Sequence, residues 1–353
     1  MTTVDLIVGS YSERRPGREV AGEGVSLLSF DSDTGALATR DVSGGLLNPS
    51  YVLTHGSLVH TVIETPVETA GLATLQARDG RLSLLGQVPV SGDGPCHIDR
   101  HADGFLAVSC YESGHVSIHP VDAAGVAQAA GCVVAHAGSG PNAARQAGPH
   151  AHAAAFSPDG RTLLVADLGT DEIWCHRFDA ATGQLHADAV RWQAPPGSGP
   201  RLLLFSRAQD HVLLLTELGC GVLSLRWQDG ALTLRGSAST LAPGWTGPNT
   251  AAGLRWHPSG HWFAASNRGA DSIALFSFDA GAIRQVAAIG AGGPKPRDFE
   301  FSPCGRWLLA ASQDGDCISV LAVDADRLTD TGIRHRVGTP SCVRFLSNPE
   351  TTP

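Results

Sequence analysis

Short apolar runs alternate along this chain with turns rich in glycine, proline and aspartate, and one such pattern recurs. An aromatic residue, a turn built on proline and glycine, and a second apolar run follow one another at Phe156–Asp167, Trp256–Asn267 and Phe301–Ser312. Apolar runs of this length, bounded by turn residues, predict β-strands. We therefore expect each copy to be a pair of strands within one repeating unit.

Degenerate copies of this pattern extend along the chain. The turn glycine, or its equivalent, recurs about every 50 residues, at Gly56, Gly104, Gly160, His211, Gly260 and Gly305. A strand-turn-strand unit at this period is typical of a β-propeller, an all-β fold in which four-stranded antiparallel blades surround a central channel. These markers account for six blades.

A seventh blade is predicted to be split between the two ends of the chain. Residues 5–11 and 24–30 resemble the later strands of a blade that lacks its first strand. Pro340–Leu346 resembles that missing strand, because it matches Pro296–Phe301. Pairing the C-terminal strand with the N-terminal blade would close the ring and remove open sheet edges. We predict a seven-bladed β-propeller.

Composition is compatible with this fold. The chain has 353 residues, of which 42% are hydrophobic and 17% charged, with 42 Gly and 21 Pro. No linker or charge run divides the repeats, so we expect a single domain over residues 1–353. The longest irregular stretch, residues 131–148, precedes a histidine cluster. Long loops in compact folds are often functional.

Charge and hydropathy exclude several partners. The formal charge is -9, and Lys295 is the only lysine. Nucleic acids and membrane surfaces require a basic stripe, so we expect neither as a partner. No apolar run reaches the ~20 residues of a transmembrane helix, and the first residues lack the basic and apolar regions of a secretion signal. We expect a cytoplasmic protein; the oligomeric state stays open.

Metal binding is not expected either. The eight cysteines are scattered without a C-x-x-C pair, and most fall in strand-like runs, so we interpret them as buried, reduced thiols. His150 and His152 have the i, i+2 spacing of two residues on one strand face, but no third ligand with recognisable spacing accompanies them. We predict a protein without metal or other cofactor.

Polar residues occur where the first strand of a unit begins and where the second strand ends. Because the two strands are antiparallel, both places lie on the same face of the disc, at one end of the channel. Convergent polar groups in a concave site are the usual form of a small-molecule pocket. The candidates are His97, His150, His152, Arg201 and Arg297 at strand starts, and Tyr11, Glu64, Tyr111, Glu217, Arg268 and Gln313 at strand ends. His97 is equally suited to a structural role, and Asp167 is better suited to bridging blades.

Several phrases in a fixed order carry a resemblance to a known family: Gly148–His152, Asp167–Gly169, Gly199–Arg201, Ser266–Arg268 and Pro296–Asp298. Together they resemble the lactonase family of seven-bladed propellers. That family includes the propeller type of 6-phosphogluconolactonase and the fungal carboxy-cis,cis-muconate cyclase. In the cyclase, a His, an Arg, a Glu and a second Arg are the proposed catalytic residues. The resemblance implies these roles for His152 (or His150), Arg201, Glu217 and Arg268.

The chain departs from the family pattern at two positions. Leu202 stands where the family commonly has a histidine, and Gly253-Leu254 stands where it has an acidic residue before an isoleucine. The first departure removes any role for that histidine, and the second alters the pocket wall. The fold prediction is unaffected, while the substrate assignment is weakened.

Hydrolysis of a sugar lactone requires a base for the attacking water and donors for the developing oxyanion. Glu217, or the pair His150 and His152, would serve as base, and Arg201 would keep the glutamate ionised. Arg268 and Arg297 would hold a phosphate or carboxylate bidentately. His97, Tyr111 and Gln313 complete the candidate substrate-binding set. No G-x-S-x-G elbow is present, so no acyl-enzyme is expected.

Three functions stay open. The resemblance favours a metal-free lactonase acting on 6-phospho-D-glucono-1,5-lactone, because 6-phosphogluconolactonase is the common bacterial assignment. A cycloisomerase like the muconate cyclase would use the same anion clamps and proton-transfer residue. A propeller that binds a small molecule or a protein without turnover is the third alternative.

Overall fold

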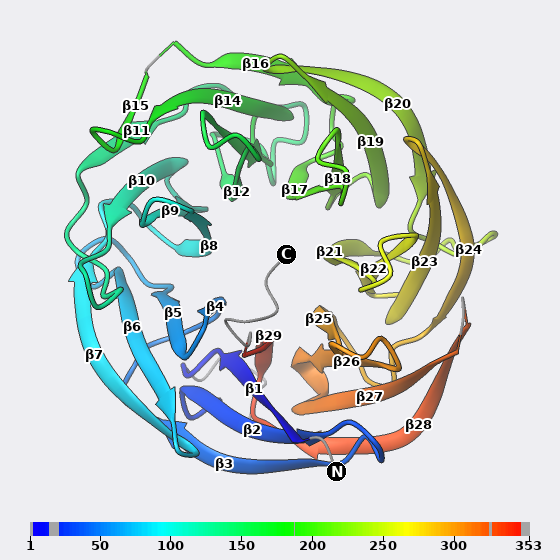
Figure 1. Ribbon diagram of the computed structural model, residues 1–353. Helices are drawn as coiled ribbons and strands as arrows, with labels where there is room; N and C mark the ends of the chain where they lie inside the picture. The colour runs from blue at the N-terminus through cyan, green and yellow to red at the C-terminus, as the bar shows by residue number, and fades with distance from the viewer. Residues whose placement is uncertain (1–2, 14–20, 187, 325–326, 347–353) are drawn as a thin grey trace.

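A computed structural model describes residues 3–13, 21–186, 188–324 and 327–346. Seven antiparallel sheets stand around a central channel like the blades of a propeller (Figure 1). Six sheets have four strands, and the sheet of β12 carries one short additional strand, β15. The predicted all-β fold is thus confirmed. Within the described residues, no helix has the length and apolar character needed to cross a membrane.

Each blade uses four consecutive strands, except the one that joins the two ends of the chain. From the channel outward the blades are β4 (Val52–His55), β5 (Leu58–Ile63), β6 (Gly71–Arg78) and β7 (Arg81–Pro89); β8 (Pro95–His101), β9 (Phe105–Cys110), β10 (His115–Pro120) and β11 (Cys132–Ala135); β12 (Ala151–Phe156), β13 (Thr162–Asp167), β14 (Glu172–Asp179) and β16 (Val190–Gln193); β17 (Pro200–Phe205), β18 (His211–Thr216), β19 (Gly221–Gln228) and β20 (Ala231–Ser239); β21 (Thr250–Trp256), β22 (Trp262–Arg268), β23 (Ser272–Asp279) and β24 (Ala282–Gly290); β25 (Pro296–Phe301), β26 (Trp307–Ser312), β27 (Cys317–Asp324) and β28 (Arg327–Arg336); and β29 (Pro340–Phe345), β1 (Thr3–Ser10), β2 (Val25–Asp31) and β3 (Leu37–Ser43). Strand β15 (Gln184–Leu185) pairs with β14, and the 3-10 helix η1 (Gln313–Gly315) precedes β27.

The ring closes where the sequence predicts. The C-terminal strand β29 is the innermost strand of the N-terminal blade and pairs antiparallel with β1, with Val343 opposite Val8 and Phe345 opposite Leu6. Without this pairing, β1 and β29 would each present an unpaired edge; together they complete one sheet. The two ends of the fold are held together by this pairing.

Packing between neighbouring blades explains the glycine in the recurring turn. Gly160 has a φ of 69°, a left-handed conformation that glycine adopts without strain, and a Cβ there would lie 2.3 Å from Nε2 of His101 in the preceding blade. His101 donates a hydrogen bond of 3.0 Å to the carbonyl of Gly160. Gly305 and His257 repeat this contact three blades later in the ring, with a bond of 3.0 Å. The glycine thus leaves room for a histidine of the preceding blade, which hydrogen-bonds to the turn.

The hydrophobic core lies between blades rather than within one. Seven clusters of buried side chains fill the wedges between neighbouring sheets. In one of them, Leu213 of β18 packs with Phe263 of β22 and Phe276 of β23, and all three are fully buried. Because each blade is needed to cover its neighbours, the inner strands are fixed around the channel.

Cysteine placement follows the prediction in large part. The eight cysteines are free, and five of them are buried. The exposed Cys304 departs from the prediction because it occupies the turn between β25 and β26 rather than a strand.

Candidate active site

A β-bulge at the start of the first strand positions the residues that line the channel. In six blades the pairing of the first and second strands is interrupted near this start; it skips one residue of the first strand in five of them and two in β21. An extra residue of this kind turns its side chain away from the sheet alternation. The skipped residues that line the channel are Cys96, His152, Arg201, Ala252, Arg297 and Ser341. We call these six, together with Ser50 before β4, the channel ring.

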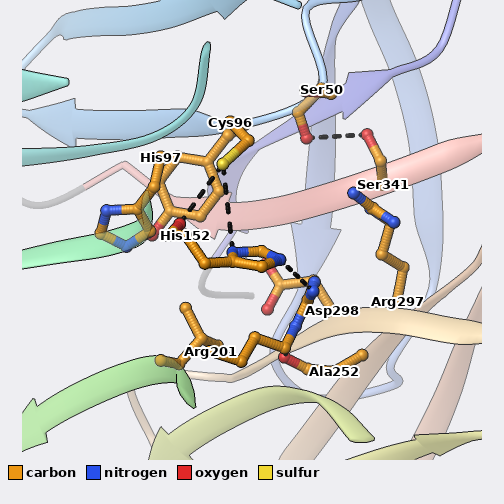
Figure 2. A pocket seen from close by; sticks show the side chains of 11 residues that line it. Ser50, Cys96, His97, His152, Arg201, Ala252, Arg297, Asp298 and Ser341 are labelled. Carbon is orange, nitrogen blue, oxygen red and sulfur yellow. Dashed lines mark hydrogen bonds between the residues drawn. The ribbon is translucent and has the colours of Figure 1, made fainter. Parts of the chain in front are cut away.

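The channel ring surrounds a deep cavity (Figure 2) of about 30 Å³. Its remaining lining residues are Tyr51, His97, Leu202 and Asp298. Above it a wider cavity of about 220 Å³ opens at the mouth of the channel. The mouth cavity is lined by Tyr11, Glu64, Cys96, Tyr111, Glu112, Arg145, His152, Arg201, Glu217, Arg268 and Arg297. Cys96, His152, Arg201 and Arg297 belong to both cavities.

Glu217, directly after β18, is the centre of the charge network in the mouth cavity. Its Oε2 lies 2.5 Å from Nη1 of Arg201 and 2.9 Å from Nη2 of Arg268. Its Oε1 accepts a hydrogen bond of 2.8 Å from Nη2 of Arg145. Three guanidinium groups from three different parts of the chain therefore meet on one carboxylate, which is 3% exposed. A buried carboxylate requires such compensation.

Electrostatics keep this carboxylate ionised. Burial opposes the charge, but Arg268 and Arg201, with smaller contributions from His152 and Arg145, hold the pKa of Glu217 well below its usual range. Burial, together with the neighbouring Arg201 and Arg297, lowers the pKa of Arg268 to about 10, although Glu217 acts against this shift. Both groups are charged at neutral pH.

His152 lies beside this network as a neutral imidazole. Its Nε2 accepts a short hydrogen bond from Nη1 of Arg201 and lies 3.8 Å from Oε2 of Glu217. Its Nδ1 is 4.0 Å from Sγ of Cys96. Burial, followed by the charge of Arg201, holds the pKa of His152 well below its usual value. The site thus contains a buried carboxylate and a neutral base side by side.

The structure separates His150 from His152. His150 precedes β12, its ring stacks on Tyr111 at 4.5 Å, and its Nδ1 donates to the Tyr111 carbonyl at 2.7 Å. The expectation that both histidines share a strand face is wrong, because the bulge at His152 breaks the alternation. Only His152 lines the cavities.

The remaining predicted residues are distributed over the two cavities. Tyr111 lines the mouth cavity and accepts a hydrogen bond of 3.0 Å from Arg145. His97 lies in the deep cavity, where its Nε2 is 3.0 Å from the hydroxyl of Tyr51. Arg297 lines both cavities with its guanidinium 5.1 Å from the ring centre of Tyr11. Gln313 opens η1 and is not among the residues that line either cavity.

Two features of the site were not assigned from the sequence. Arg145 extends to Glu217 from the loop between β11 and β12. The stretch 131–148 was predicted to be irregular throughout, but residues 132–135 form β11, and only the length of the stretch signalled a function. Cys96 and Ser341 join the channel ring, and only their position after a proline at a strand start could have indicated this. Leu202, where the family commonly has histidine, lines the deep cavity.

Asp167 has the structural role that the sequence favoured. Its Oδ1 accepts hydrogen bonds from the backbone N–H groups of His150, Gly169 and Thr170. Its Oδ2 lies 2.7 Å from Nδ1 of His136, which follows β11 of the preceding blade. The carboxylate therefore ties two blades together and fixes the segment that leads into β12. Among the described residues, no group of three or more His, Cys, Asp or Glu forms a candidate metal site.

Comparison with known proteins identifies the class of this chain. The family described as "Lactonase, 7-bladed beta-propeller" matches residues 5–345, so the chain belongs to this lactonase family. The 6-phosphogluconolactonase of Bacillus subtilis (strain 168) is 28% identical over 309 residues, which cover 85% of this chain and 86% of that protein. The 6-phosphogluconolactonase of Formosa agariphila is 27% identical over 308 residues, covering 83% and 85%.

A solved structure supports the same relationship. The periplasmic gluconolactonase of Pseudomonas aeruginosa superimposes with a TM-score of 0.90 and is 29% identical, covering 99% of this chain and 100% of that one. The name of that protein refers to an unphosphorylated lactone, whereas the names of the two sequence relatives refer to a phosphorylated one. The family is therefore clear, and the choice between these substrates is a separate question.

Proposed function

We propose that this protein is a lactonase that hydrolyses a sugar lactone, with 6-phospho-D-glucono-1,5-lactone as its substrate. The observation that carries the proposal is the cluster in the mouth cavity, where Glu217 and a neutral His152 lie among the guanidinium groups of Arg145, Arg201 and Arg268. Carboxylate, imidazole and guanidinium groups are what ester hydrolysis without a covalent intermediate needs.

In the proposed reaction, water attacks the lactone carbonyl while a proton acceptor removes its proton. Glu217 and His152 are the two groups placed to accept that proton. Negative charge grows on the carbonyl oxygen, and donors that are already oriented stabilise it at little reorganisation cost. Arg201 and Arg268 serve this role, because Arg201 is also fixed by donation from its Nε to the carbonyl of Ala252 at 2.8 Å.

An anionic substrate suits the positive lining of the cavity. Arg297 lies against Tyr11 and lines the mouth with the other three arginines. Guanidinium groups bind phosphate and carboxylate in a planar, bidentate manner. A sugar phosphate substrate implies the cytoplasm, so this location is part of the proposal. The cycloisomerase alternative would use the same anion-binding groups, and the names of the relatives favour hydrolysis.

The proposal is tested by mixing the purified protein with fresh 6-phosphogluconolactone, with and without a chelator, and following ring opening against the spontaneous rate. Acceleration that persists with the chelator is expected. In Glu217→Gln we expect kcat to fall on the order of 100-fold or more. Circular dichroism and a thermal melt establish that the variant is folded.

Equal rates with and without the protein, for both 6-phosphogluconolactone and glucono-1,5-lactone, would exclude the lactonase proposal. Muconates and simple ligand binding would then be examined. An unchanged rate in a folded Glu217→Gln variant would remove Glu217 from the mechanism and leave His152 as the proton acceptor.

A further inference from the structure

The two oxygens of the Glu217 carboxylate have different surroundings. Oε2 lies between Arg201 at 2.5 Å and Arg268 at 2.9 Å, with His152 at 3.8 Å. Among the described residues, Arg145 is the only side chain that donates a hydrogen bond to Oε1, at 2.8 Å. Loss of that one contact would leave Oε1 unoccupied while the carboxylate stays in place.

Arg145 is also the most accessible of these arginines. Its side chain is 37% exposed, whereas those of Arg201 and Arg268 are 7% and 10% exposed. Arg201 and Arg268 extend from the strands β17 and β22, but Arg145 extends from a loop over the mouth of the channel. It is therefore the arginine that an incoming anion reaches first.

The loop itself is anchored independently of Arg145. Gln146 is fully buried, donates a hydrogen bond of 2.8 Å to the carbonyl of Leu168, and accepts one of 3.0 Å from the backbone of Asn142. The side chain of Arg145 can therefore leave Glu217 without displacement of the loop. Its bond to the Tyr111 hydroxyl, at 3.0 Å, is made by the same Nη2 atom and would be given up in the same movement.

We propose that Arg145 selects for a lactone carrying an anionic group: it leaves Oε1 of Glu217 to bind the phosphate of the substrate, and this exchange frees Oε1 to act as the base. This inference rests on the proposed function and deepens it. The substrate phosphate replaces one carboxylate oxygen as the partner of Arg145, so the guanidinium keeps a counterion throughout. A neutral lactone has no group that could make the exchange.

The freed oxygen completes a balanced reaction. A water oxygen bonds to the lactone carbonyl carbon, and its proton passes to Oε1 of Glu217. The bond between that carbon and the ring oxygen then breaks, and the ring oxygen takes the proton back from Glu217. The product is the open-chain hydroxy acid, which releases a proton to solvent on ionising, and Glu217 returns to its carboxylate form.

The test compares two substrates in two arginine variants. For the wild type, Arg145→Met and Arg145→Lys, kcat and KM are measured with 6-phosphogluconolactone and with glucono-1,5-lactone, which lacks the phosphate. In Arg145→Met we expect the ratio of the two kcat/KM values, phosphorylated to neutral, to fall about tenfold to a hundredfold. Arg145→Lys keeps a cation and should give an intermediate ratio. Inorganic phosphate should compete with the phosphorylated lactone in the wild type and much less in Arg145→Met.

Arg235→Met is the matched control, because Arg235 is an exposed arginine on the outer strand β20. The ratio of kcat/KM values, phosphorylated to neutral, should be the same in this variant as in the wild type. If Arg145→Met slows both lactones by the same factor, or neither, the selection role is wrong even though the lactonase proposal stands. If the wild type opens neither lactone, the proposed function itself fails, so the two failures are distinguishable.

Discussion

Buried histidines keep their neutral form in several places in this molecule. His60 is 1% exposed, and its Nδ1 lies 3.1 Å from the hydroxyl of Thr74. Burial, with a smaller contribution from Arg100, lowers the pKa of His60 to about 4. Burial likewise lowers the pKa of His97 to about 3. Protonation of such a group therefore favours the unfolded chain.

The stability of the protein should reflect this at His60. An unfolded histidine takes up its proton near pH 6.5, but folded His60 does so only near pH 4. The stability that neutral His60 contributes is therefore fully present above the unfolded pKa of about 6.5. It is lost as the pH falls from there to the folded pKa of about 4, by about 1.4 kcal/mol per pH unit. Between pH 7 and pH 5 the free energy of unfolding of the wild type should fall by about 2 kcal/mol more than that of His60→Gln.

Urea unfolding at both pH values measures this difference. His261→Gln is the control, because His261 is exposed, and it should follow the wild type. Equal losses in the wild type and in His60→Gln would contradict the assignment of His60 as a neutral group.

Individual residues of the site were predictable to different degrees. His152, Arg201, Glu217 and Arg268 belong to the polar residues at strand starts and ends, which must converge at the channel, and the family resemblance singled them out. The structure brings these four together. The choice between His150 and His152 depends on a bulge, which residue spacing does not reveal. Loop residues such as Arg145 have no strand register at all, so their position depends on tertiary contacts.

At the level of elements, the bulged first strands explain why the channel has a specific lining. A regular strand would alternate its side chains between the two neighbouring blades, and none would project along the sheet into the channel. The repeated bulge directs one side chain per blade inward in six blades. The strand hairpins were predictable from the turn pattern. The bulges were not, because a proline precedes four of the bulged residues but not His152 or Ala252.

The limited space inside the channel ring makes a further prediction possible. Ala252→Leu adds a larger side chain to a cavity of about 30 Å³, and overpacking should lower the free energy of unfolding by about 1–3 kcal/mol. Ala231→Leu, at an exposed position on β20, should change it by less than about 0.5 kcal/mol. Chemical denaturation of both variants checks this, and equal stabilities would show that Ala252 does not face a confined space.

For the whole molecule, stability depends on closure of the ring. The C-terminal strand supplies the innermost part of the N-terminal blade, and Val343 within it is fully buried against side chains of the neighbouring blade that contains β26 and β27. This arrangement was predictable because the N-terminal unit, residues 5–11 and 24–30, lacks a first strand and Pro340–Leu346 matches the first strand of another blade. Which residues pair across the closure was not predictable, since register depends on packing.

Disruption of the closing strand should therefore affect the entire propeller. Val343→Asp places an uncompensated carboxyl group in the core and should lower the free energy of unfolding by more than about 3 kcal/mol. Exposure of the β1 edge should also promote aggregation. Val133→Asp, at a position 41% exposed on β11, serves as control. Thermal melts and size-exclusion chromatography would show both effects, and a soluble Val343→Asp variant with the wild-type melting temperature would contradict them.

The channel ring has a consequence for engineering. Six of its seven positions lie in the first strands of six separate sheets, and Ser50 lies just before β4, the first strand of the seventh, so each blade contributes one position. A combinatorial library restricted to Ser50, Cys96, His152, Arg201, Ala252, Arg297 and Ser341 would therefore remodel the floor of the pocket from every side, while leaving the wedges of apolar packing that hold the blades together untouched.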